Sequence, residues 1–322
     1  MLHHFTRSIA HIALPDKFTY PFHYTPHPLC VMAADEVQVY LQHQAQWQDE
    51  LQQGKMFGVL IVQTTEGEIG YLAAFSGILA GKNIHPYFVP PIYDLLQPDG
   101  FFKKEEEHIS AINHRIRELE EDTSYQKCRQ ALEEETARCS RLLSQAKAKL
   151  KAAKELRDCR RQTEQLSESE QAAMIRESQF QKAELKRLER SLKEHLSSLQ
   201  KETDTYVSQI EALKNERKSR SATLQQQLFE QFRLLNARGE VKDLCSIFAH
   251  TVHKIPPAGA GECAAPKLLQ YAYFHHYRPV AMAEFWWGDS PKAEIRHHGH
   301  YYPACKGKCE PILGHMLQGL EV

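Results

Sequence analysis

The feature that most constrains the fold is a long internal stretch without proline or glycine. From Lys103 to Arg238 neither residue occurs, and Glu, Lys, Arg, Gln, Ala and Leu dominate. Proline and glycine are the residues that most often interrupt helices, and the dominant residues here all favour the helical state. The stretch therefore predicts long helices in the middle of the chain.

Apolar residues recur within this stretch at helical spacing. Those of the later half form a seven-residue series with filled neighbouring positions, namely Leu185, Leu192, Leu199, Tyr206 and Leu213 with Leu188, Leu196 and Ile210. Those of the earlier half are spaced by three or four, namely Ile109, Ile112, Ile116 and Leu119. This spacing is typical of a coiled coil. One very long single helix is the alternative, but it would expose both apolar stripes to water.

A reversal of the chain is expected near the middle of the stretch. Ser167 and Glu170 have the Ser-x-x-Glu spacing of a helix N-cap with its capping box. Folding there gives an antiparallel hairpin with arms of roughly 60 residues, each about 90 Å long. It would bring acidic residues near basic ones, namely Glu118, Glu120, Glu121 and Asp122 near Lys214, Arg217 and Lys218.

The flanks of the stretch read as globular sequence. Residues 33–51 predict an amphipathic helix, and 56–64 with 68–77 predict a β-hairpin around Thr65, Glu66 and Gly67. Later segments predict a helix within 262–277, a buried strand over 279–288 and a final short helix. The apolar character of the strands indicates that both faces of their sheet are covered.

A hairpin returns the chain to the point where it left, so the flanks can share one core. We therefore expect an α/β (α+β) fold, a small sheet with helices, interrupted by a long antiparallel α-helical coiled-coil hairpin. Residues 1–104 would form the first half of the globular domain, 105–238 the coiled-coil arm and 239–322 the second half. Two separate globular domains are the alternative.

The bulk composition bounds the compartment and the partners. The chain of 322 residues is 42% hydrophobic and 25% charged, with a net charge of −1, so no global field attracts nucleic acid or membrane. The apolar run from Phe57 to Val62 is too short to span a bilayer, and the first residues do not resemble a secretory signal. Lone cysteines on a predicted helix (Cys128, Cys139 and Cys159) suggest a reducing compartment. We expect a cytoplasmic protein without a membrane partner.

A candidate metal site lies in the last quarter of the chain. Cys305 and Cys309 are spaced C-x3-C, Cys263 precedes a predicted helix, and several histidines lie nearby in the sequence, namely His297, His298, His300 and His315. Thiolates and imidazoles are the ligands that zinc prefers, usually four of them. We predict a zinc site formed by Cys263, Cys305, Cys309 and His300. The alternative is a small core residue at Cys263 and two ordinary loop thiols.

The order of these elements resembles the zinc-dependent deaminase fold. In that family one ligand comes from a [HC]-x-E helix start and two come from P-C-x-x-C. Here Ala265 stands where the family has its general acid/base glutamate, and the cysteine pair has one extra intervening residue. Glu262 and Glu284 are close in the sequence, but neither has the family spacing. The resemblance thus implies a deaminase-like scaffold with a structural zinc rather than an active deaminase.

A second candidate site is a basic cluster near the expected tip of the arm. Between positions 138 and 161 nine basic residues face two acidic ones, a net charge of +7. The nine are Arg138, Arg141, Lys147, Lys149, Lys151, Lys154, Arg157, Arg160 and Arg161. Such a cluster suits contact with phosphate backbones, although charge runs on helices are also often plain solvated surface. No aromatic residues lie among them to stack on bases.

Several segments resemble the long N-terminal extension of a bacterial subgroup of RluA-type pseudouridine synthases. They span nearly the whole chain and include YTPHPLCVMAADEVQVYL, GKMFGVLIVQTTEGEIGYLAAFSG, HPYFVPPIYDLL, PPAGAGECAAPKLLQYA, PVAMAEFWWGDSP and EIRHHGHYYPACKGKCEPILGHMLQGL. The resemblance implies a chain associated with RNA, by implication ribosomal RNA, and with uridine isomerisation.

The catalytic motif of that family, of H-R-L-D-x-x-T-S-G type, has no match here. His114-Arg115-Ile116-Arg117 is a superficial likeness within a predicted helix, without the aspartate. The sequence therefore leaves enzyme activity undecided and predicts a non-catalytic accessory region whose arm contacts rRNA. The synthase catalytic domain would be supplied in cis or in trans, since the chain ends about where that domain would begin. The alternatives are a divergent zinc-dependent deaminase-like hydrolase and a coiled-coil structural or dimerisation protein.

Overall fold

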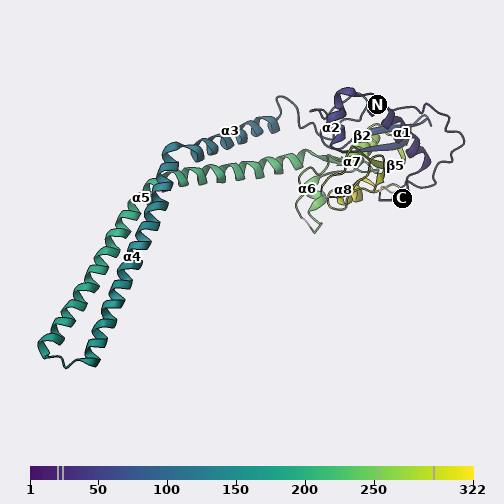
Figure 1. Ribbon diagram of the computed structural model, residues 1–322. Helices are drawn as coiled ribbons and strands as arrows, with labels where there is room; N and C mark the ends of the chain where they lie inside the picture. Colours follow the sequence, from purple (N-terminus) through teal and green to yellow (C-terminus); the bar gives the residue numbers. More distant parts are fainter. Residues whose placement is uncertain (20–21, 24, 253, 293) are drawn as a thin grey trace. The chain divides into compact units, whose positions relative to one another are not determined.

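The structure is a computed structural model that describes residues 1–19, 22–23, 25–252, 254–292 and 294–322 (Figure 1). The chain divides into two compact units. The first comprises Met1–Glu106 with Ala222–Val322, and the second comprises Glu107–Ser221. The first unit resumes at Ala222, earlier than the expected position 239. Phe229, near the end of the last long helix, and Phe232, just after it, are buried in the core of the first unit.

The first unit is built on a four-stranded antiparallel sheet. Its strands are β1 (Lys55–Gln63), β2 (Ile69–Phe75), β5 (Arg278–Trp287) and β6 (Tyr301–Tyr302), in the spatial order β2-β1-β5-β6. The predicted hairpin and the predicted later strand are thus confirmed, and they join sequences from both ends of the chain in one sheet. A second, two-stranded sheet pairs β3 (Arg233–Leu235) with β4 (Val241–Asp243).

The turn of the hairpin forms where the sequence predicts it. The Thr64 N–H donates to Glu68 O at 2.9 Å, and the Gly67 N–H donates to Thr64 O at 3.0 Å. Gly67 has a φ of +87°, a left-handed conformation that costs glycine little.

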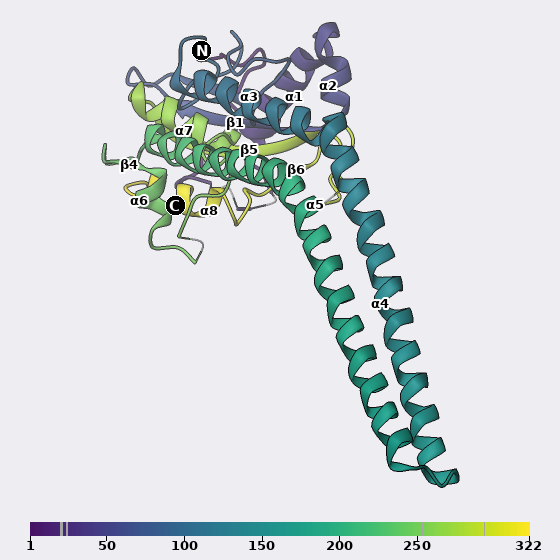
Figure 2. The ribbon, with the colours of Figure 1, turned by 90° about the vertical axis from the view of Figure 1, so that its left-hand side faces the viewer.

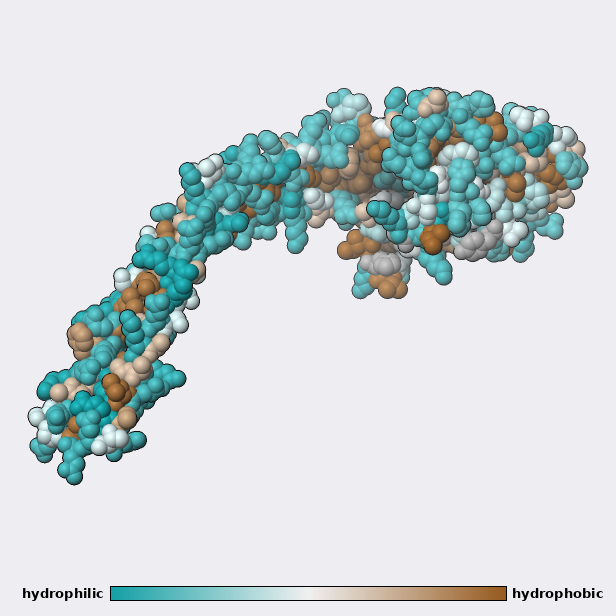
Figure 3. All heavy atoms as spheres, viewed as in Figure 1, coloured by the Kyte–Doolittle hydropathy of each residue, from teal (hydrophilic) through white to brown (hydrophobic). Residues whose placement is uncertain are grey.

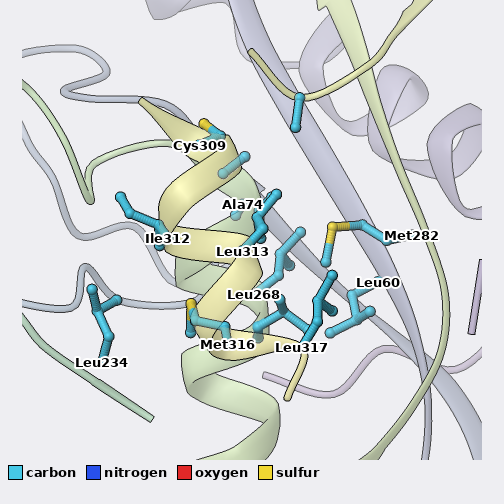
Figure 4. Close-up of a cluster of buried hydrophobic side chains, with 14 of the residues drawn as sticks. Leu60, Ala74, Leu234, Leu268, Met282, Cys309, Ile312, Leu313, Met316 and Leu317 are labelled. Atoms are coloured by element: carbon cyan, nitrogen blue, oxygen red, sulfur yellow. The ribbon is translucent and has the colours of Figure 1, made fainter. Parts of the chain in front are cut away.

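Helices cover both faces of the sheet, as the apolar strands predict. On one face lies α1 (Pro28–Gln42), which packs with Phe57, Val59 and Phe285. On the other lie α7 (Ala264–Phe274) and α8 (Cys309–Met316), and Figure 4 shows Leu268, Ile312 and Leu313 of these helices among Leu60, Ala74 and Met282 of the strands. Successive β1 side chains alternate between the two faces: Val59 and Ile61 pack on the α1 side, and Leu60 and Val62 pack on the side of α7 and α8. This is the two-residue repeat of a strand that is buried on both faces.

One predicted helix is divided in the structure. The expected helix over 33–51 begins earlier, because His27 caps α1 and Pro28 occupies its first position. It ends at Gln42 and is followed by η1 (Ala45–Trp47) and α2 (Gln48–Gln52), where the Trp47 side chain is buried. A further short helix, α6 (Leu244–Phe248), follows β4.

The central stretch is helical but is also divided. Its helices are α3 (Phe101–Glu121), α4 (Thr123–Thr163) and α5 (Glu168–Gln231). The break between α3 and α4 falls at Asp122, whose backbone is not helical (ψ 126°) and whose carboxylate accepts hydrogen bonds from the N–H groups of Ser124 and Tyr125. Neither proline nor glycine lies at this break. The absence of these residues therefore did not predict that the helix would be interrupted here.

Side chains of α5 pair with side chains of α3 and α4 at several separate positions, and both views show α4 and α5 side by side (Figure 2). As positions rise along α3 and α4, their partners on α5 fall: Glu120 pairs with Lys214, Glu135 with His195, and Lys147 with Glu189. A small apolar cluster of Ile116, Leu119 and Ile210 lies in the same unit. Of the acidic and basic residues expected to meet, Glu120 and Lys214 do so at 2.7 Å.

The capping box at Ser167 forms as predicted. The Glu170 carboxylate accepts a hydrogen bond from the Ser167 backbone N–H at 2.8 Å, and the Ser167 hydroxyl lies 3.4 Å from the Glu170 N–H. These contacts satisfy backbone donors at the start of α5. Within the described residues, no helix is long and apolar enough to cross a membrane.

Candidate functional site

A cavity of about 490 Å³ in the first unit contains all three cysteines of the predicted metal set. We call it the cysteine cavity. The side chains that define it are Cys263, Cys305, Cys309 and Glu284, and its rim includes Trp286, Arg296 and Lys308. Residues more than forty positions apart in the sequence thus meet at one place.

Two of the cysteines stand at the starts of helices. Cys263 is the N-cap residue of α7, and Cys309 is the first residue of α8, where Figure 4 shows it at the end of the helix above Ile312 and Leu313. Cys309 is buried, Cys263 is partly buried and Cys305 is exposed, and each is a free thiol.

The thiols interact with one another through Cys309. Its side chain hydrogen-bonds to the thiols of Cys263 and Cys305, which raises the pKa of Cys309. The hydrogen bond from Cys309, with backbone N–H groups at positions 308 and 309 and the charge of Lys308, lowers the pKa of Cys305 to about 5 against the opposing effect of burial. Cys305 is therefore the member of the set that is a thiolate near neutral pH.

Glu284 brings a carboxylate to the same cavity. It lies on β5, opposite Gly58 of β1 and Tyr302 of β6, and its side chain is only 5% exposed. Its Oε1 accepts a hydrogen bond from the Ala265 N–H in the first turn of α7 at 3.2 Å. Burial raises the pKa of Glu284 to about 7.

Gly58 makes the space that this arrangement needs. A Cβ built at that position would lie 3.0 Å from Ala264 Cβ, 3.1 Å from Leu268 Cδ1 and 3.5 Å from Glu284 Cγ. A side chain at this position would therefore require Ala264 and Leu268 of α7 to move by a few tenths of an ångström.

Lys267 lines a neighbouring pocket that shares Gly77 and Glu262 with the cysteine cavity. Its Nζ donates to the backbone oxygens of Phe75 at 2.9 Å and Gly77 at 3.3 Å, although the residue is only 2% exposed. Burial lowers the pKa of Lys267 to about 8. The Gly77 N–H in turn donates to Glu262 O at 3.0 Å, so this lysine joins the end of β2 to the loop before Cys263.

The predicted fourth ligand does not join the cysteines. His300 does not line the cavity, and its ring lies 5.3 Å from that of His297. His298 accepts a hydrogen bond from the Gly288 N–H, and His315 is buried against Leu234 O. His300 accepts a hydrogen bond at its backbone oxygen from the Trp286 N–H, and His315 lies on α8.

As the side chains stand, their donor atoms do not converge as the ligands of an ion. Among the residues that the structure describes, no group of three or more His, Cys, Asp or Glu side chains has that geometry. The cysteine cavity collects a zinc-like donor set, but its thiols contact one another instead of a common centre.

A second site lies between α4 and α5 in the second unit. A groove of about 400 Å³ is lined by five members of the predicted basic cluster and by Lys182 of α5, against one acidic residue. We call it the basic groove; its charged residues are Lys147, Lys151, Lys154, Arg157, Arg161, Lys182 and Asp158. Figure 3 shows the largely hydrophilic surface of these helices.

The nine basic residues of the sequence cluster differ in their surroundings. Arg157 is 6% exposed, and its guanidinium donates to Gln181 Oε1 at 2.7 Å, so it links α4 to α5 rather than facing solvent. Exposed cations with acidic partners are Arg138, Lys147, Lys151, Arg160 and Arg161. Arg141, Lys149 and Lys154 are exposed as well.

From the sequence, Glu284 of the cysteine cavity was set aside because it lacks the deaminase spacing, and Lys267 of the neighbouring pocket was not singled out. Glu284 interrupts the apolar strand Ala-Met-Ala-Glu-Phe-Trp-Trp, and Lys267 interrupts the apolar start of α7. A charged residue inside a buried apolar run is itself a signal, because its burial requires a partner or a function.

Comparison with protein-family models, with curated proteins and with solved structures gives no match for this chain. The chemistry of both sites therefore rests on the residues themselves.

Proposed function

We propose that this chain is an RNA-associated accessory region of an RNA pseudouridine synthase, and that the basic groove of the second unit contacts RNA. The sequence blocks that resemble the extension of RluA-type synthases support the association with uridine modification. The observation that carries the proposal is the gathering of five exposed cations, with the buried Arg157, around one groove lined by a single carboxylate.

The spacing of these cations fits a phosphate backbone. Lys147, Lys151 and Lys154 follow each other at intervals of four and three, so their side chains project from the same face of α4. Lys182 adds a cation from α5 across the groove. A row of cations held by two helices neutralises successive phosphates without reading base sequence, and such contacts supply most of the affinity of non-specific binding.

Pairing of the helices gives this groove its walls. We propose that α3, α4 and α5 form an antiparallel coiled coil, supported by the falling order of the α5 partners and by the apolar cluster around Ile116 and Ile210. The role of the apolar heptad positions, which are half-buried or buried, would then be to hold the two helices at a fixed separation.

For the first unit we propose a deaminase-like layout. The hairpin β1–β2, the helix α7 headed by Cys263, the strand β5 beside β1, and α8 opened by Cys309 follow the order of elements in that fold. Uridine isomerisation itself would require the catalytic domain of a synthase, because this sequence contains no match to the aspartate motif.

The test is equilibrium binding of the full chain to ribosomal RNA. A triple variant, Lys147→Gln with Lys151→Gln and Lys154→Gln, removes three groove cations. A matched control, Lys127→Gln with Lys186→Gln and Lys218→Gln, removes the same charge from exposed positions of the second unit outside the groove. We expect the groove variant to raise the Kd by about tenfold or more at moderate salt, and the control to change it much less.

Equal weakening in both variants would mean that only overall charge matters, and the groove would have no role. Retained affinity in the groove variant would refute RNA binding at this site. Circular dichroism of both variants checks that helix content is unchanged.

A further inference from the structure

The first unit has a second cavity, of about 440 Å³, which shares no lining residue with the cysteine cavity within the described part of the chain. We call it the tyrosine cavity. It is formed by the N-terminal segment, α1, β2 and the loop that follows β2, and its walls include Arg7, Asp35, Glu36, Tyr40, Tyr71 and Tyr87. Its volume is that of a site for a small molecule.

The N-terminal segment forms one wall of this cavity because it pairs with the sheet. The His3 N–H donates to Tyr71 O at 2.9 Å, and the Tyr71 N–H donates to His3 O at 2.9 Å. Gly70 permits this approach, since a Cβ at that position would lie 2.6 Å from His3 O. The segment that carries Thr6 and Arg7 is therefore attached to β2.

The aromatic rings of the cavity are stacked on one another. The rings of Tyr40 and Tyr87 lie 3.8 Å apart at an angle of 12°, and the His3 ring lies 4.1 Å from that of Tyr87. Trp47 and Phe88 contact Tyr40 edge to face at 6.1 and 5.9 Å. Tyr40 is thus held on several sides while it lines the cavity, and such a ring is a surface on which a nucleobase can stack.

Two neighbouring carboxylates of α1 also line the cavity, and they differ in their contacts. Glu36 Oε1 accepts hydrogen bonds from the Thr6 N–H at 2.9 Å and the Thr6 hydroxyl at 2.7 Å, and Oε2 accepts one from the Tyr71 hydroxyl at 3.0 Å. These contacts hold Glu36 in one orientation. Asp35 is exposed, and its carboxylate has no hydrogen bond or ion pair with any residue that the structure describes. Asp35 is therefore the carboxylate that can accept hydrogen bonds from a ligand.

Arg7 adds a cation to the same cavity. Its side chain is exposed and forms no ion pair with the described residues. A guanidinium binds phosphate well, whereas it repels a ligand that is only a cation. A ligand with a flat ring, an edge of N–H donors and a phosphate would use Tyr40, Asp35 and Arg7 together.

The hydrogen-bonding edge of the base selects among nucleotides. Guanine presents an amide N–H beside an exocyclic amino group, and these two donors match the two oxygens of a carboxylate. Uracil presents one N–H between two carbonyl oxygens, which a carboxylate repels. Asp35 therefore favours guanine over uracil.

We propose that the tyrosine cavity binds one guanine nucleotide, with the base stacked on Tyr40, its N–H edge donating to Asp35 and its phosphate in contact with Arg7. A free mononucleotide and an unpaired guanosine of RNA offer the same groups. In the second case, which rests on the proposed function, the first unit would add a base preference to the phosphate contacts of the basic groove.

The experiment is calorimetric titration of the full chain with guanosine monophosphate and with uridine monophosphate, which carry the same phosphate and differ in the base. We expect the Kd for guanosine monophosphate to be lower by about tenfold or more. Asp35→Asn should remove this preference, and Arg7→Gln should remove the advantage of guanosine monophosphate over guanosine. Asp16→Asn, at an exposed carboxylate of the same unit outside the cavity, is the control and should bind as the wild type does.

Equal affinities for the two nucleotides, no binding of either, or a preference that survives Asp35→Asn would overturn the site. Tetramethylammonium that displaces guanosine monophosphate would show a cation site instead, and would also overturn it.

RNA hairpins with a single unpaired guanine or uracil in the loop distinguish the two sources of the nucleotide. A preference for the guanine loop that Asp35→Asn removes assigns the site to RNA, whereas binding of the mononucleotide without this preference assigns it to a free nucleotide. The groove variant at Lys147, Lys151 and Lys154 should bind guanosine monophosphate as the wild type does. A failure of RNA binding at the basic groove is therefore distinguishable from a failure of the tyrosine cavity.

Discussion

The carboxylate of Glu284 accepts a hydrogen bond of 3.2 Å from the backbone N–H of Ala265, two positions after Cys263. In the deaminase-like layout proposed for the first unit, position 265 corresponds to the glutamate of the family pattern. Here the helix contributes only its backbone, and the carboxylate comes from the neighbouring strand β5. The contact therefore ties the sheet, the start of α7 and the cysteine cavity together.

Gly58 should be the position on β1 that is most sensitive to a small substitution. Gly58→Ala places a methyl group 3.0 Å from Ala264 Cβ, and overpacking of this kind costs about 1–3 kcal/mol. Urea denaturation followed by tryptophan fluorescence measures the loss. Gly314→Ala on α8 is the control, because nothing lies within 4 Å of its added methyl group and alanine favours a helix over glycine. An equal loss in both variants would contradict the packing argument.

Lys267 should make stability rise with pH above the neutral range. Burial lowers its pKa to about 8 in the folded state, against 10.5 for the ordinary side chain. Between these values the unfolded chain binds more protons than the folded one, so the free energy of unfolding increases as pH rises from about 8 to 10.5. Denaturation midpoints measured across this window should rise in the wild type relative to Lys267→Met. Parallel pH profiles for the two proteins would refute the role assigned to this lysine.

The capping box at Ser167 should contribute measurably to the second unit. Ser167→Ala removes the hydroxyl that hydrogen-bonds with Glu170 at the start of α5, and loss of such a cap costs about 0.5–2 kcal/mol. Thermal unfolding followed by circular dichroism at 222 nm, a wavelength that reports helix, is the measurement. Ser191→Ala within α5 is the control, where alanine is at least as good a helix former. A drop in the control but not at Ser167 would contradict the assignment.

Substitutions at Arg157 and Lys154 should distinguish a cation that stabilises the second unit from one that contacts RNA. Arg157 is buried, and its guanidinium donates to Gln181 at 2.7 Å, so Arg157→Gln should destabilise the second unit by about 1–3 kcal/mol. Lys154 is exposed and lines the basic groove, so Lys154→Gln should weaken RNA binding with little change in stability. Parallel melting curves and binding titrations of both variants compare the two effects. The reverse order of effects would remove the distinction drawn between these residues.

The sequence predicted those parts of the fold that follow from local pattern. The hairpin β1–β2 has apolar runs around a glycine turn, and the start of α5 has its capping residues, so short-range chemistry determines both. The grouping of Cys263, Cys305 and Cys309 was predicted from the C-x3-C spacing, from the position of Cys263 before a helix and from the preference of zinc for thiolates.

The remaining features depend on contacts between distant segments. The Asp122 break between α3 and α4 arises at a single capping residue inside a run of good helix formers. Glu284 joins the cysteines only because β5 pairs with β1 beside α7, and His300 is carried away because the turn after β5 pairs back on Trp286. Neither pairing can be read from residue spacing, since both are set by the register of strands.

The salt dependence of RNA affinity tests the central claim most directly. The Kd of the full chain for ribosomal RNA, measured at several salt concentrations, gives a slope of log affinity against log salt that counts the phosphates contacted. If the basic groove binds RNA, the triple variant at Lys147, Lys151 and Lys154 should reduce this slope by about three, and the matched control should leave it nearly unchanged. An identical slope for the wild type and the groove variant would contradict the account.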